Sequence, residues 1–375
     1  MIDKYCVLIN NDVLEGNWSN DYRYGKPPTH WSGSYAILKQ WYASLCSRVK
    51  YGQCWVFAGV MCSVMRLLGI PCRVVTNFQS AHDTNQNLII DNYYDEYGIK
   101  DKATRDSIWN FHVWVEGWMR RPDLADDGRY DGWQVLDATP QEKSEAHTYD
   151  TMTKYANILS PLSDYVGMQE STPVNGQDVN LKLVLNSDSI AARKLFININ
   201  VQAMRYTGKP VANIQNQVVE KELLPGKDLI IPILVPYSTY NKRMVHCESM
   251  NFSALITDLQ NEDNIYLGSK CVVLKDPPMT IRVSDEVRVN QEMTVEVAFT
   301  NPVNEILRDC TLTLSGTGLF KWEEIARLPD LMPNKKLHVK MSTVPYKSGE
   351  KTLLVDFDCA SFRDIKTSCI VHVNP

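Results

Sequence analysis

The sequence lacks the features of a membrane-spanning or conventionally exported protein. A membrane-spanning helix needs about 20 consecutive apolar residues. The apolar runs here are much shorter, and one of the longest, Cys54–Cys62, is soon followed by Arg66. The first six residues contain no basic start that leads into an apolar stretch, so they do not resemble a secretory signal. We therefore expect a soluble, cytoplasmic protein, with non-classical export and membrane association left open.

Positive charge is scarce too, and several nucleotide and metal motifs are missing. Lys and Arg total 39 against 44 for Asp and Glu, a formal net charge of −5, which argues against nucleic-acid binding through phosphate neutralisation. The sequence has no Walker loop, no GxGxxG motif and no zinc-ligand spacing, so the corresponding enzyme classes are set aside. The ten cysteines form no CxxC pair, and mostly free thiols are expected.

The residues that are present are unevenly distributed along the chain. Eight of the nine tryptophans precede residue 134. From about Gly176 onward the chain consists of short alternating runs such as Val179–Leu185, Phe196–Val201 and Met293–Phe299, and this alternation is typical of half-buried strands. We expect an α+β domain over 1–160, a first β-sandwich over 161–276 and a second over 277–375. A single large β-domain in place of the two sandwiches is the alternative.

One helix is well defined by its periodicity. Apolar residues recur at helical spacing from Cys54 to Leu68, and Gly69 and Pro71 then stop the helix. Cys54 is thereby placed at the helix N-terminus, where unpaired backbone N–H groups and the helix dipole favour a thiolate. Cys54 is therefore a candidate nucleophile. Segments 109–117 and 133–138 are predicted to be strands.

A histidine and an aspartate on these two strands would complete a catalytic triad. Alternation puts His112 on the opposite face from its apolar neighbours Phe111 and Val113. Asp137 ends an apolar strand, where an ionised carboxylate needs a partner such as an imidazolium. A thiol nucleophile needs a nearby base, and that base needs a group to orient it. The alternatives are a buried structural thiol, a hydrogen-bonded core imidazole and a strand-end turn former.

The sequence around these residues resembles a known family. Segments Tyr51–Ala58 (YGQCWVFA), Trp109–Trp114 (WNFHVW) and Gly132–Glu142 (GWQVLDATPQE) resemble, in order, the three active-site motifs of animal transglutaminases. Four shorter segments also resemble this family: Gly16–Trp18, Val74–Phe78, Ser80–Asp83 and Arg121–Leu124. The resemblance implies a shortened papain-like cysteine (transglutaminase) core of α+β type, followed by two immunoglobulin- or fibronectin-like β-sandwiches.

By the same resemblance, the chain is expected to be a calcium-dependent protein-glutamine γ-glutamyltransferase. Cys54 would attack the side-chain carboxamide of a glutamine and form a thioester, which a lysine, a polyamine or another primary amine would resolve as an isopeptide bond. His112 would be the general base and acid, and Asp137 would orient it. The expected partners are proteins that carry glutamine and lysine, together with primary amines, and not nucleic acid.

Four aromatic residues receive roles from this resemblance. Trp18 matches the tryptophan whose indole N–H holds the oxyanion together with the backbone N–H of Cys54. Trp55 and Trp109 resemble the active-site and tunnel tryptophans, which favour an amine over water. Tyr206 resembles the tyrosine that hydrogen-bonds the catalytic cysteine in the resting form, so it would be a gate. Ordinary packed aromatic side chains are the alternative for all four.

Oxygen-bearing side chains gather in one loop. Asp83, Asn85 and Asn87 alternate along the chain, and a hard cation such as Ca²⁺ favours oxygen ligands. The spacing is not that of an EF-hand. The resemblance makes these three residues and Asp106 calcium ligands, although Ile89 stands where some members offer a hydroxyl. The alternative is a solvated turn held by Asx hydrogen bonds.

The match to the family breaks at two places. The chain begins almost at the Gly16–Trp18 motif, without the β-sandwich that precedes the core in relatives. After Pro140–Glu145, where the family continues with further strands, the chain reaches Lys154–Asn157 almost at once, so part of the catalytic sheet is expected to be missing. Two other functions stay open. One is a catalytically silent scaffold that acts through its β-domains, and the other is a papain-like thiol hydrolase that uses water rather than an amine.

Overall fold

The structure is a computed structural model, and the chain folds into two compact units. It describes residues 13–84, 89–100, 106–140, 165–170, 173–187, 189–244 and 247–375. One unit contains the described residues within Met1–Phe78, Phe111–Glu142 and Pro278–Pro375, and the other contains those within Gln79–Asn110 and Lys143–Pro277. Strand β4 (Ser107–Met119) contributes residues to both units. The domain boundaries expected from the sequence stay predictions.

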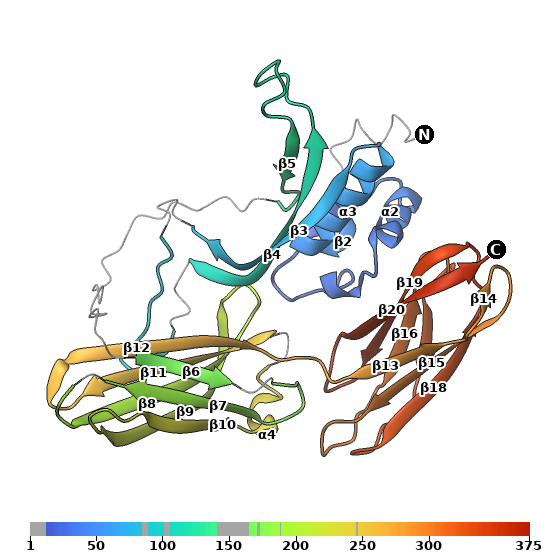
Figure 1. Cartoon of the computed structure of the whole chain (residues 1–375). Helices are drawn as coiled ribbons and strands as arrows, with labels where there is room; N and C mark the ends of the chain where they lie inside the picture. The colour runs from blue at the N-terminus through green and yellow to red at the C-terminus, as the bar shows by residue number, and fades with distance from the viewer. Residues whose placement is uncertain are drawn as a thin grey trace. The chain divides into compact units, whose positions relative to one another are not determined.

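The helix predicted at 54–68 forms as α3, which spans Cys54–Leu67. Gly69 follows it with a φ of 83°, a conformation that glycine adopts without the steric cost of a Cβ atom. One face of α3, from Cys54 to Met65, packs with the buried valines of β4 in a single apolar cluster. Figure 1 shows α3 lying against the sheet that contains β4. Helical periodicity thus predicts both the extent and the buried face of this element.

Short elements complete the part of the chain around α3. They are β1 (Leu14–Gly16), η1 (Pro28–His30), α2 (Ser34–Ala43), β2 (Val49–Gly52), β3 (Cys72–His82) and β5 (Gly132–Leu136). β1 and β2 pair in parallel, and the strand order of the other sheet is β3-β4-β5. The two strands expected from the sequence are confirmed as β4 and β5, with ends shifted by one or two residues.

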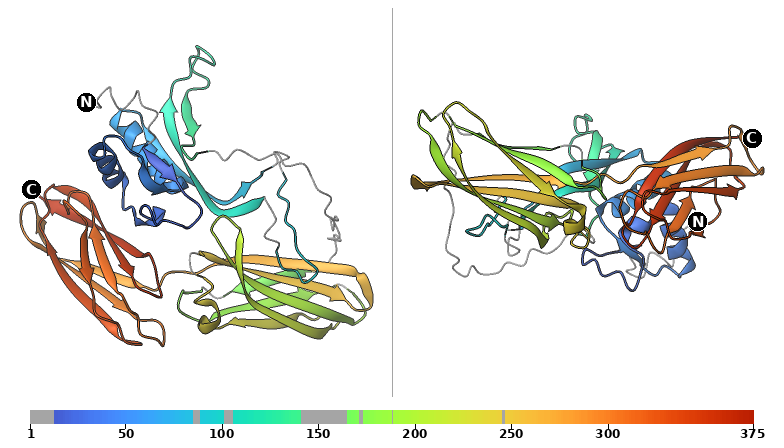
Figure 2. Two further views of the ribbon diagram at one scale, coloured as in Figure 1. Left: turned by 180° about the vertical axis from the view of Figure 1, so that it is seen from behind. Right: turned by 90° about the horizontal axis from the view of Figure 1, so that it is seen from below.

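The first β-sandwich has two sheets, with strand orders β10-β7-β6 and β12-β11-β8-β9. Figure 2 shows this domain in green to light orange. Its elements are β6 (Tyr165–Glu170), β7 (Val179–Asn186), β8 (Arg193–Met204), β9 (Pro210–Leu223), β10 (Leu229–Val235), α4 (Tyr237–Tyr240), β11 (Ser249–Asp258) and β12 (Asn261–Val273). Alternate residues of β8, including Ile197 and Ile199, enter the core between the sheets. The residues of opposite orientation are buried as well: Asn198, Asn200 and Gln202 are only 3%, 2% and 2% exposed. The expectation of a half-buried β8 is therefore wrong, because other chain segments cover its polar face.

The second β-sandwich also has two sheets, ordered β13-β15-β18 and β14-β20-β19-β16-β17. Its strands are β13 (Met279–Val283), β14 (Val287–Arg288), β15 (Met293–Thr300), β16 (Thr311–Ser315), β17 (Glu324–Arg327), β18 (Lys336–Thr343), β19 (Gly349–Asp358) and β20 (Ile365–Asn374). Phe299 and Phe357, from different sheets, meet in the core with ring centroids 4.5 Å apart. The expected fold class, an α+β core followed by two β-sandwiches, is confirmed.

The sequence also predicts mostly free cysteine thiols and no membrane-spanning helix. Eight cysteines among the described residues are free thiols, whereas Cys46 is disulfide-bonded. The expectation of mostly free thiols therefore holds with one exception. Across the part of the chain that the structure describes, no helix is both long enough and apolar enough to cross a membrane.

Candidate active site

Cys54 is the first residue of α3 and is completely buried. Gln53 precedes it with an extended backbone (φ −134°), and the Gln53 carbonyl accepts hydrogen bonds from the backbone N–H groups of Val56 and Phe57 at 2.8 and 3.1 Å. These bonds start the helix at Cys54, as the sequence predicts. The residue is 0% exposed and packs among the apolar side chains of α3 and β4.

Burial reverses the protonation state that the sequence suggested for this cysteine. Burial raises the pKa of the Cys54 thiol to about 11, and the nearby charge of Asp137 also raises it. The backbone N–H groups of Val113 and Trp55 act in the opposite direction, with a smaller effect. The free-energy cost of removing a thiolate from water is larger than the stabilisation that the helix N-terminus gives to the thiolate. The resting Cys54 is therefore a thiol, and a base must remove its proton.

His112 and Asp137 lie in contact, as expected from the strand pattern. His112 is on β4, and Asp137 directly follows β5, whose Leu136 pairs with Val115. His112 Nε2 is 2.7 Å from Asp137 Oδ2, and Asp137 Oδ1 accepts the backbone N–H of Thr139 at 2.9 Å. Asp137 thus ends the strand with an Asx-type turn and orients the imidazole at the same time.

The orientation of His112 determines which ring nitrogen can act as a base. With the Nε2 hydrogen directed at the carboxylate, Nδ1 is the basic atom of the neutral ring. Nδ1 is buried, whereas the side chains of His112 and Asp137 as a whole are 22% and 39% exposed. The Cys54 thiol lies beside the backbone N–H of Val113, the residue after His112. The three residues of the predicted triad therefore gather where α3 begins and β5 ends.

The Gly16–Trp18 motif lies beside the start of α3. The backbone N–H of its asparagine donates to the carbonyl of Gly52 at 3.1 Å, and its carbonyl accepts a hydrogen bond from Gln53 Nε2 at 2.8 Å. These bonds hold the motif's tryptophan next to the residues that precede Cys54. Trp55 contacts β4 through Phe111, with ring centroids 5.7 Å apart. Trp18 packs against the apolar cluster that contains Val56 and Phe57 of α3. Two of the three tryptophans with predicted roles, Trp18 and Trp55, therefore lie beside the first turn of α3.

Trp109 and Tyr206 contact each other in the other compact unit. Their ring centroids are 5.6 Å apart in an edge-to-face arrangement, and the Tyr206 carbonyl accepts the backbone N–H of Asn110 at 2.7 Å. Gly208 has a φ of 73°, and a Cβ atom there would lie 2.4 Å from the carbonyl oxygen of Ile108. Only glycine allows this close approach. The predicted gate residue thus packs on the predicted tunnel residue.

Asp106, one of the four predicted calcium ligands, closes a loop through hydrogen bonds. Its Oδ1 accepts the backbone N–H of Thr84 at 2.9 Å and the Thr84 hydroxyl at 2.6 Å. Its Oδ2 accepts the backbone N–H of Asp91 at 3.1 Å. The residue is 4% exposed. A single buried carboxylate therefore ties together Thr84 and Asp91, the two ends of the segment that contains the predicted ligands Asn85 and Asn87.

The chemistry of this carboxylate suits a hard cation. Burial by itself would raise the pKa of Asp106, but the hydrogen bonds from Thr84 and Asp91, helped by His82, outweigh burial, and the pKa is lowered. Asp106 is therefore ionised and offers carboxylate oxygens of the kind that a hard cation binds, and Asp83 directly precedes Thr84. The other two predicted ligands, Asn85 and Asn87, lie outside the described residues.

Comparison with known proteins agrees with this geometry. A model of the transglutaminase-like superfamily matches residues 14–138, and a model of the transglutaminase family's C-terminal Ig-like domain matches residues 277–375. Two similar proteins are protein-glutamine gamma-glutamyltransferase 5 of Mus musculus and protein-glutamine gamma-glutamyltransferase 6 of Homo sapiens. Each is 32% identical to this chain, over 98% of the chain and 68% of the relative. The chain belongs to the transglutaminase family.

The fold of a solved transglutaminase agrees with this assignment. The structure of red sea bream transglutaminase matches with a TM-score of 0.84 and 26% sequence identity, over 97% of this chain and 66% of that one. This transglutaminase chain therefore spans about two thirds of the length of its relatives. Its alignment with the mouse relative extends over 494 residues, although the chain has 375, so the relative has residues inside the matched region that this chain lacks. The predicted position of the shortening, after Glu145, lies outside the described residues.

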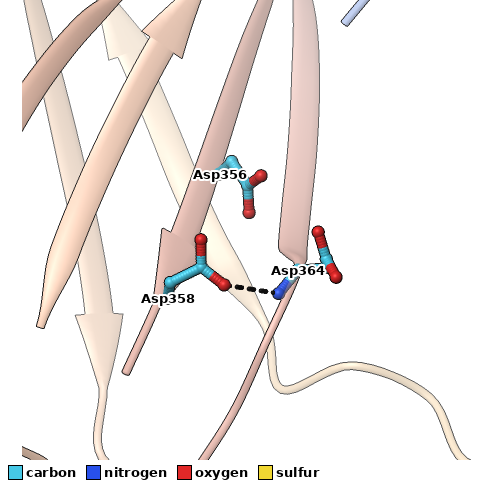
Figure 3. Close-up of side chains that lie close together, drawn as sticks. All are labelled: Asp356, Asp358 and Asp364. Atoms are coloured by element: carbon cyan, nitrogen blue, oxygen red, sulfur yellow. Dashed lines mark hydrogen bonds between the residues drawn. The ribbon is translucent and has the colours of Figure 1, made fainter. Parts of the chain in front are cut away.

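The second β-sandwich holds another group of carboxylates, shown in Figure 3. Asp356, Asp358 and Asp364 each place an oxygen within 4.8 Å of the others, and Asp358 accepts the backbone N–H of Asp364 at 2.9 Å. The Nζ of Lys366 lies 3.0 Å from Asp356 Oδ2 and 2.6 Å from Asp364 Oδ1. Lys366 already supplies a positive charge, so we interpret this group as an ion-pair network and assign no metal to it.

Two residues that contact predicted site residues of this transglutaminase chain were missed in the sequence. Thr84 holds Asp106 through both its backbone and its hydroxyl, and its position after Asp83 could have suggested a turn of this kind. Glu248 accepts the backbone N–H of Tyr206 through Oε2 at 2.7 Å. No local pattern around Glu248 points to that contact, which joins the residue before β11 to the turn after β8.

Proposed function

We propose that this chain is a calcium-dependent protein-glutamine γ-glutamyltransferase that acts through a thioester on Cys54. The observation that carries the proposal is the 2.7 Å contact between His112 and Asp137, together with the placement of Cys54 at the start of α3. The relatives named above are protein-glutamine gamma-glutamyltransferases. The substrates are proteins with accessible glutamine and lysine side chains, and primary amines such as polyamines.

In the acylation step, the sulfur of Cys54 attacks the carbonyl carbon of a glutamine carboxamide. Nδ1 of His112 accepts the thiol proton as the carbon–sulfur bond forms, and it then gives this proton to the leaving nitrogen, so ammonia departs. Asp137 stabilises the transient imidazolium. The indole N–H of Trp18 and the backbone N–H of Cys54 donate to the developing oxyanion, and one such donor contributes about 3–4 kcal/mol in a comparable oxyanion hole.

In the second step, a primary amine attacks the thioester carbonyl. His112 accepts a proton from the amine, the carbon–sulfur bond breaks, and the Cys54 thiol is restored as the isopeptide bond forms. Water could attack the same thioester and would give glutamate. Trp55 limits that side reaction by covering the reacting carbonyl with apolar surface, because exclusion of water suppresses hydrolysis of reactive intermediates. The family resemblance gives Trp109 a similar role.

Asp83, Asn85, Asn87 and Asp106 are the proposed calcium ligands. The proposal is supported by Asp106, a buried carboxylate that its hydrogen bonds keep ionised. Bound calcium would supply positive charge that holds the loop in one arrangement. Isothermal titration with CaCl₂ tests the ligand set without requiring catalysis. Asp106→Asn is expected to weaken binding by at least about tenfold because it removes a charged ligand, while equal affinity would exclude Asp106.

The transfer reaction is tested by incorporation of a fluorescent primary amine into casein. Label is expected with the full chain and calcium, and it is expected to disappear with Cys54→Ala or with a chelator. Conversion of casein glutamine residues to glutamate residues without amine incorporation would instead indicate a thiol hydrolase. Circular dichroism of each variant shows whether the protein compared is folded.

A catalytically silent scaffold is the second candidate function. It is favoured by the alignment with the mouse relative, which is longer than this chain, and by the buried, protonated Cys54. Under this alternative, the β-sandwiches would bind partners while the core makes no thioester. The folded full chain would then give no label above the Cys54→Ala control at any calcium concentration.

A further inference from the structure

A tight hairpin lies between the residues tied together by Asp106. Tyr94 and Lys100 pair as an antiparallel bridge, and Oδ1 of Asp95 accepts the backbone N–H groups of Tyr97 and Ile99 at 2.9 and 2.8 Å. The hairpin 94–100 starts shortly after Asp91, which is bonded to Asp106, and it leads along the chain toward Asp106 itself. Movement of the hairpin would therefore displace the Asp91 N–H group, which donates to Asp106.

The hairpin is held on the first β-sandwich by buried polar side chains. The carboxamide of Gln202 makes two bonds to one residue: Oε1 accepts the backbone N–H of Lys100 at 3.0 Å, and Nε2 donates to the Lys100 carbonyl at 3.2 Å. Nδ2 of Asn200 donates to the carbonyl of Tyr97 at 2.5 Å. The hydroxyl of Ser253 donates to the carbonyl of Gly98 at 2.6 Å. We call Asn200, Gln202 and Ser253 the polar clamp.

Breaking the hydrogen bonds of the polar clamp costs free energy because its three side chains are buried away from water. Asn200, Gln202 and Ser253 are 2%, 2% and 0% exposed, so a substitution that removes one of their hydrogen bonds acts on groups that water cannot readily satisfy. Gly98 approaches so closely that a Cβ atom there would lie 2.9 Å from Cβ of Leu255. The hairpin is therefore joined to β8 and β11 by buried hydrogen bonds and close packing.

We infer that the polar clamp positions the calcium ligand Asp106 and couples calcium binding to the first β-sandwich. The inference rests on the calcium-dependent function proposed above. Gln202, Asn200 and Ser253 are positioning residues, since they act through the hairpin backbone and contact no predicted ligand. Linkage requires the coupling to be reciprocal: the clamp strengthens calcium binding, and bound calcium strengthens the clamp.

Gln202→Met tests the coupling, because methionine has a similar shape but can make neither bond to Lys100. We expect the calcium Kd of the full chain, measured by titration calorimetry, to rise about tenfold, within the usual range of coupling between sites. Gln217→Met on the neighbouring strand β9 is the matched control, with an unchanged Kd. Comparison with the calorimetric titration of Asp106→Asn identifies the heat of calcium binding at Asp106, because that heat is expected to be missing in this variant.

Hydrogen exchange supplies a readout that a purely structural role would not change. In the wild type, calcium is expected to slow exchange in peptides that contain Tyr97 and Gly98, and this protection is expected to vanish in Gln202→Met. Calcium binding by Gln202→Met with the wild-type Kd would overturn the coupling and leave the calcium site intact. A wild-type chain that binds no calcium would overturn the proposed calcium function and the coupling together.

Discussion

Asp137→Asn is expected to reduce amine incorporation about 10²- to 10³-fold without unfolding the protein. Asparagine has the shape of aspartate, and only its amide oxygen can accept the Thr139 N–H that Asp137 Oδ1 accepts at 2.9 Å. The amide NH₂ group then faces His112 Nε2, which was 2.7 Å from the carboxylate. Two donors cannot face each other, so Nε2 becomes the acceptor and the ring hydrogen moves to Nδ1. In that tautomer, Nδ1 cannot take the proton of Cys54.

The magnitude follows from the exposure of the pair. A wrong tautomer in a fully enclosed triad lowers kcat about 10⁴-fold. Here the two side chains are 22% and 39% exposed, so water can partly replace the carboxylate, and we expect a loss about one to two orders of magnitude smaller.

Initial rates of fluorescent-amine incorporation at saturating calcium provide the assay. Asp127→Asn is the matched control, since Asp127 pairs with Arg129 at the surface and is 57% exposed. We expect the control to keep its rate within about twofold, as is usual for an exposed pair. If Asp137→Asn retained half the wild-type rate while folded, the tautomer argument would be wrong.

Three further perturbations test other parts of the structure. Lys366→Met removes the cation from the acidic cluster, and we expect it to lower the free energy of unfolding in urea by about 2 kcal/mol. This loss is smaller than the roughly 3–5 kcal/mol of a fully buried pair, because the Lys366 side chain is 26% exposed. An unchanged free energy of unfolding would mean that the carboxylates need no cation. Gly208→Ala places a Cβ atom 2.4 Å from the carbonyl oxygen of Ile108, at a backbone φ of 73°. We expect it to lower the free energy of unfolding by more than about 1 kcal/mol and therefore to lower the Tm. An unchanged Tm would contradict the close approach. Because the pKa of Cys54 is raised to about 11, the thiolate fraction below that pH rises with pH. The ultraviolet absorbance of the Cys54 thiolate, measured without calcium as the difference between the wild type and Cys54→Ala, should therefore increase about tenfold per pH unit from pH 7 to 10. A plateau near pH 8 would show a preformed thiolate.

The part of the site that the sequence predicts is the part determined by local pattern. Helical spacing places Cys54 at the first residue of α3, and alternation places His112 on the face of β4 opposite Val113. Asp137 is found because a carboxylate at the end of an apolar strand needs a partner. In each case, a few neighbouring residues determine the geometry.

What the sequence does not predict depends on packing between distant segments. The thiol of Cys54 is protonated because α3 and β4 together exclude water from it, and no local pattern reports that depth of burial. Asn200 and Gln202 alternate with apolar residues and therefore indicate a strand with one solvated face. A hairpin about one hundred residues earlier covers that face instead. Its contacts are to backbone groups, which leave no side-chain signature at the hairpin.

The buried thiol and the partly exposed His112–Asp137 pair together constrain the order of events in the proposed reaction. With a pKa of about 11, ionising Cys54 at pH 7.5 before attack would cost about 5 kcal/mol. A thiolate–imidazolium pair is therefore a minor species at rest, and proton transfer to His112 has to accompany attack on the carboxamide. The same burial has the opposite effect on the product of that step. A thioester carries no charge, so the environment that penalises the thiolate does not penalise the acyl-enzyme, and it keeps water away until an amine arrives.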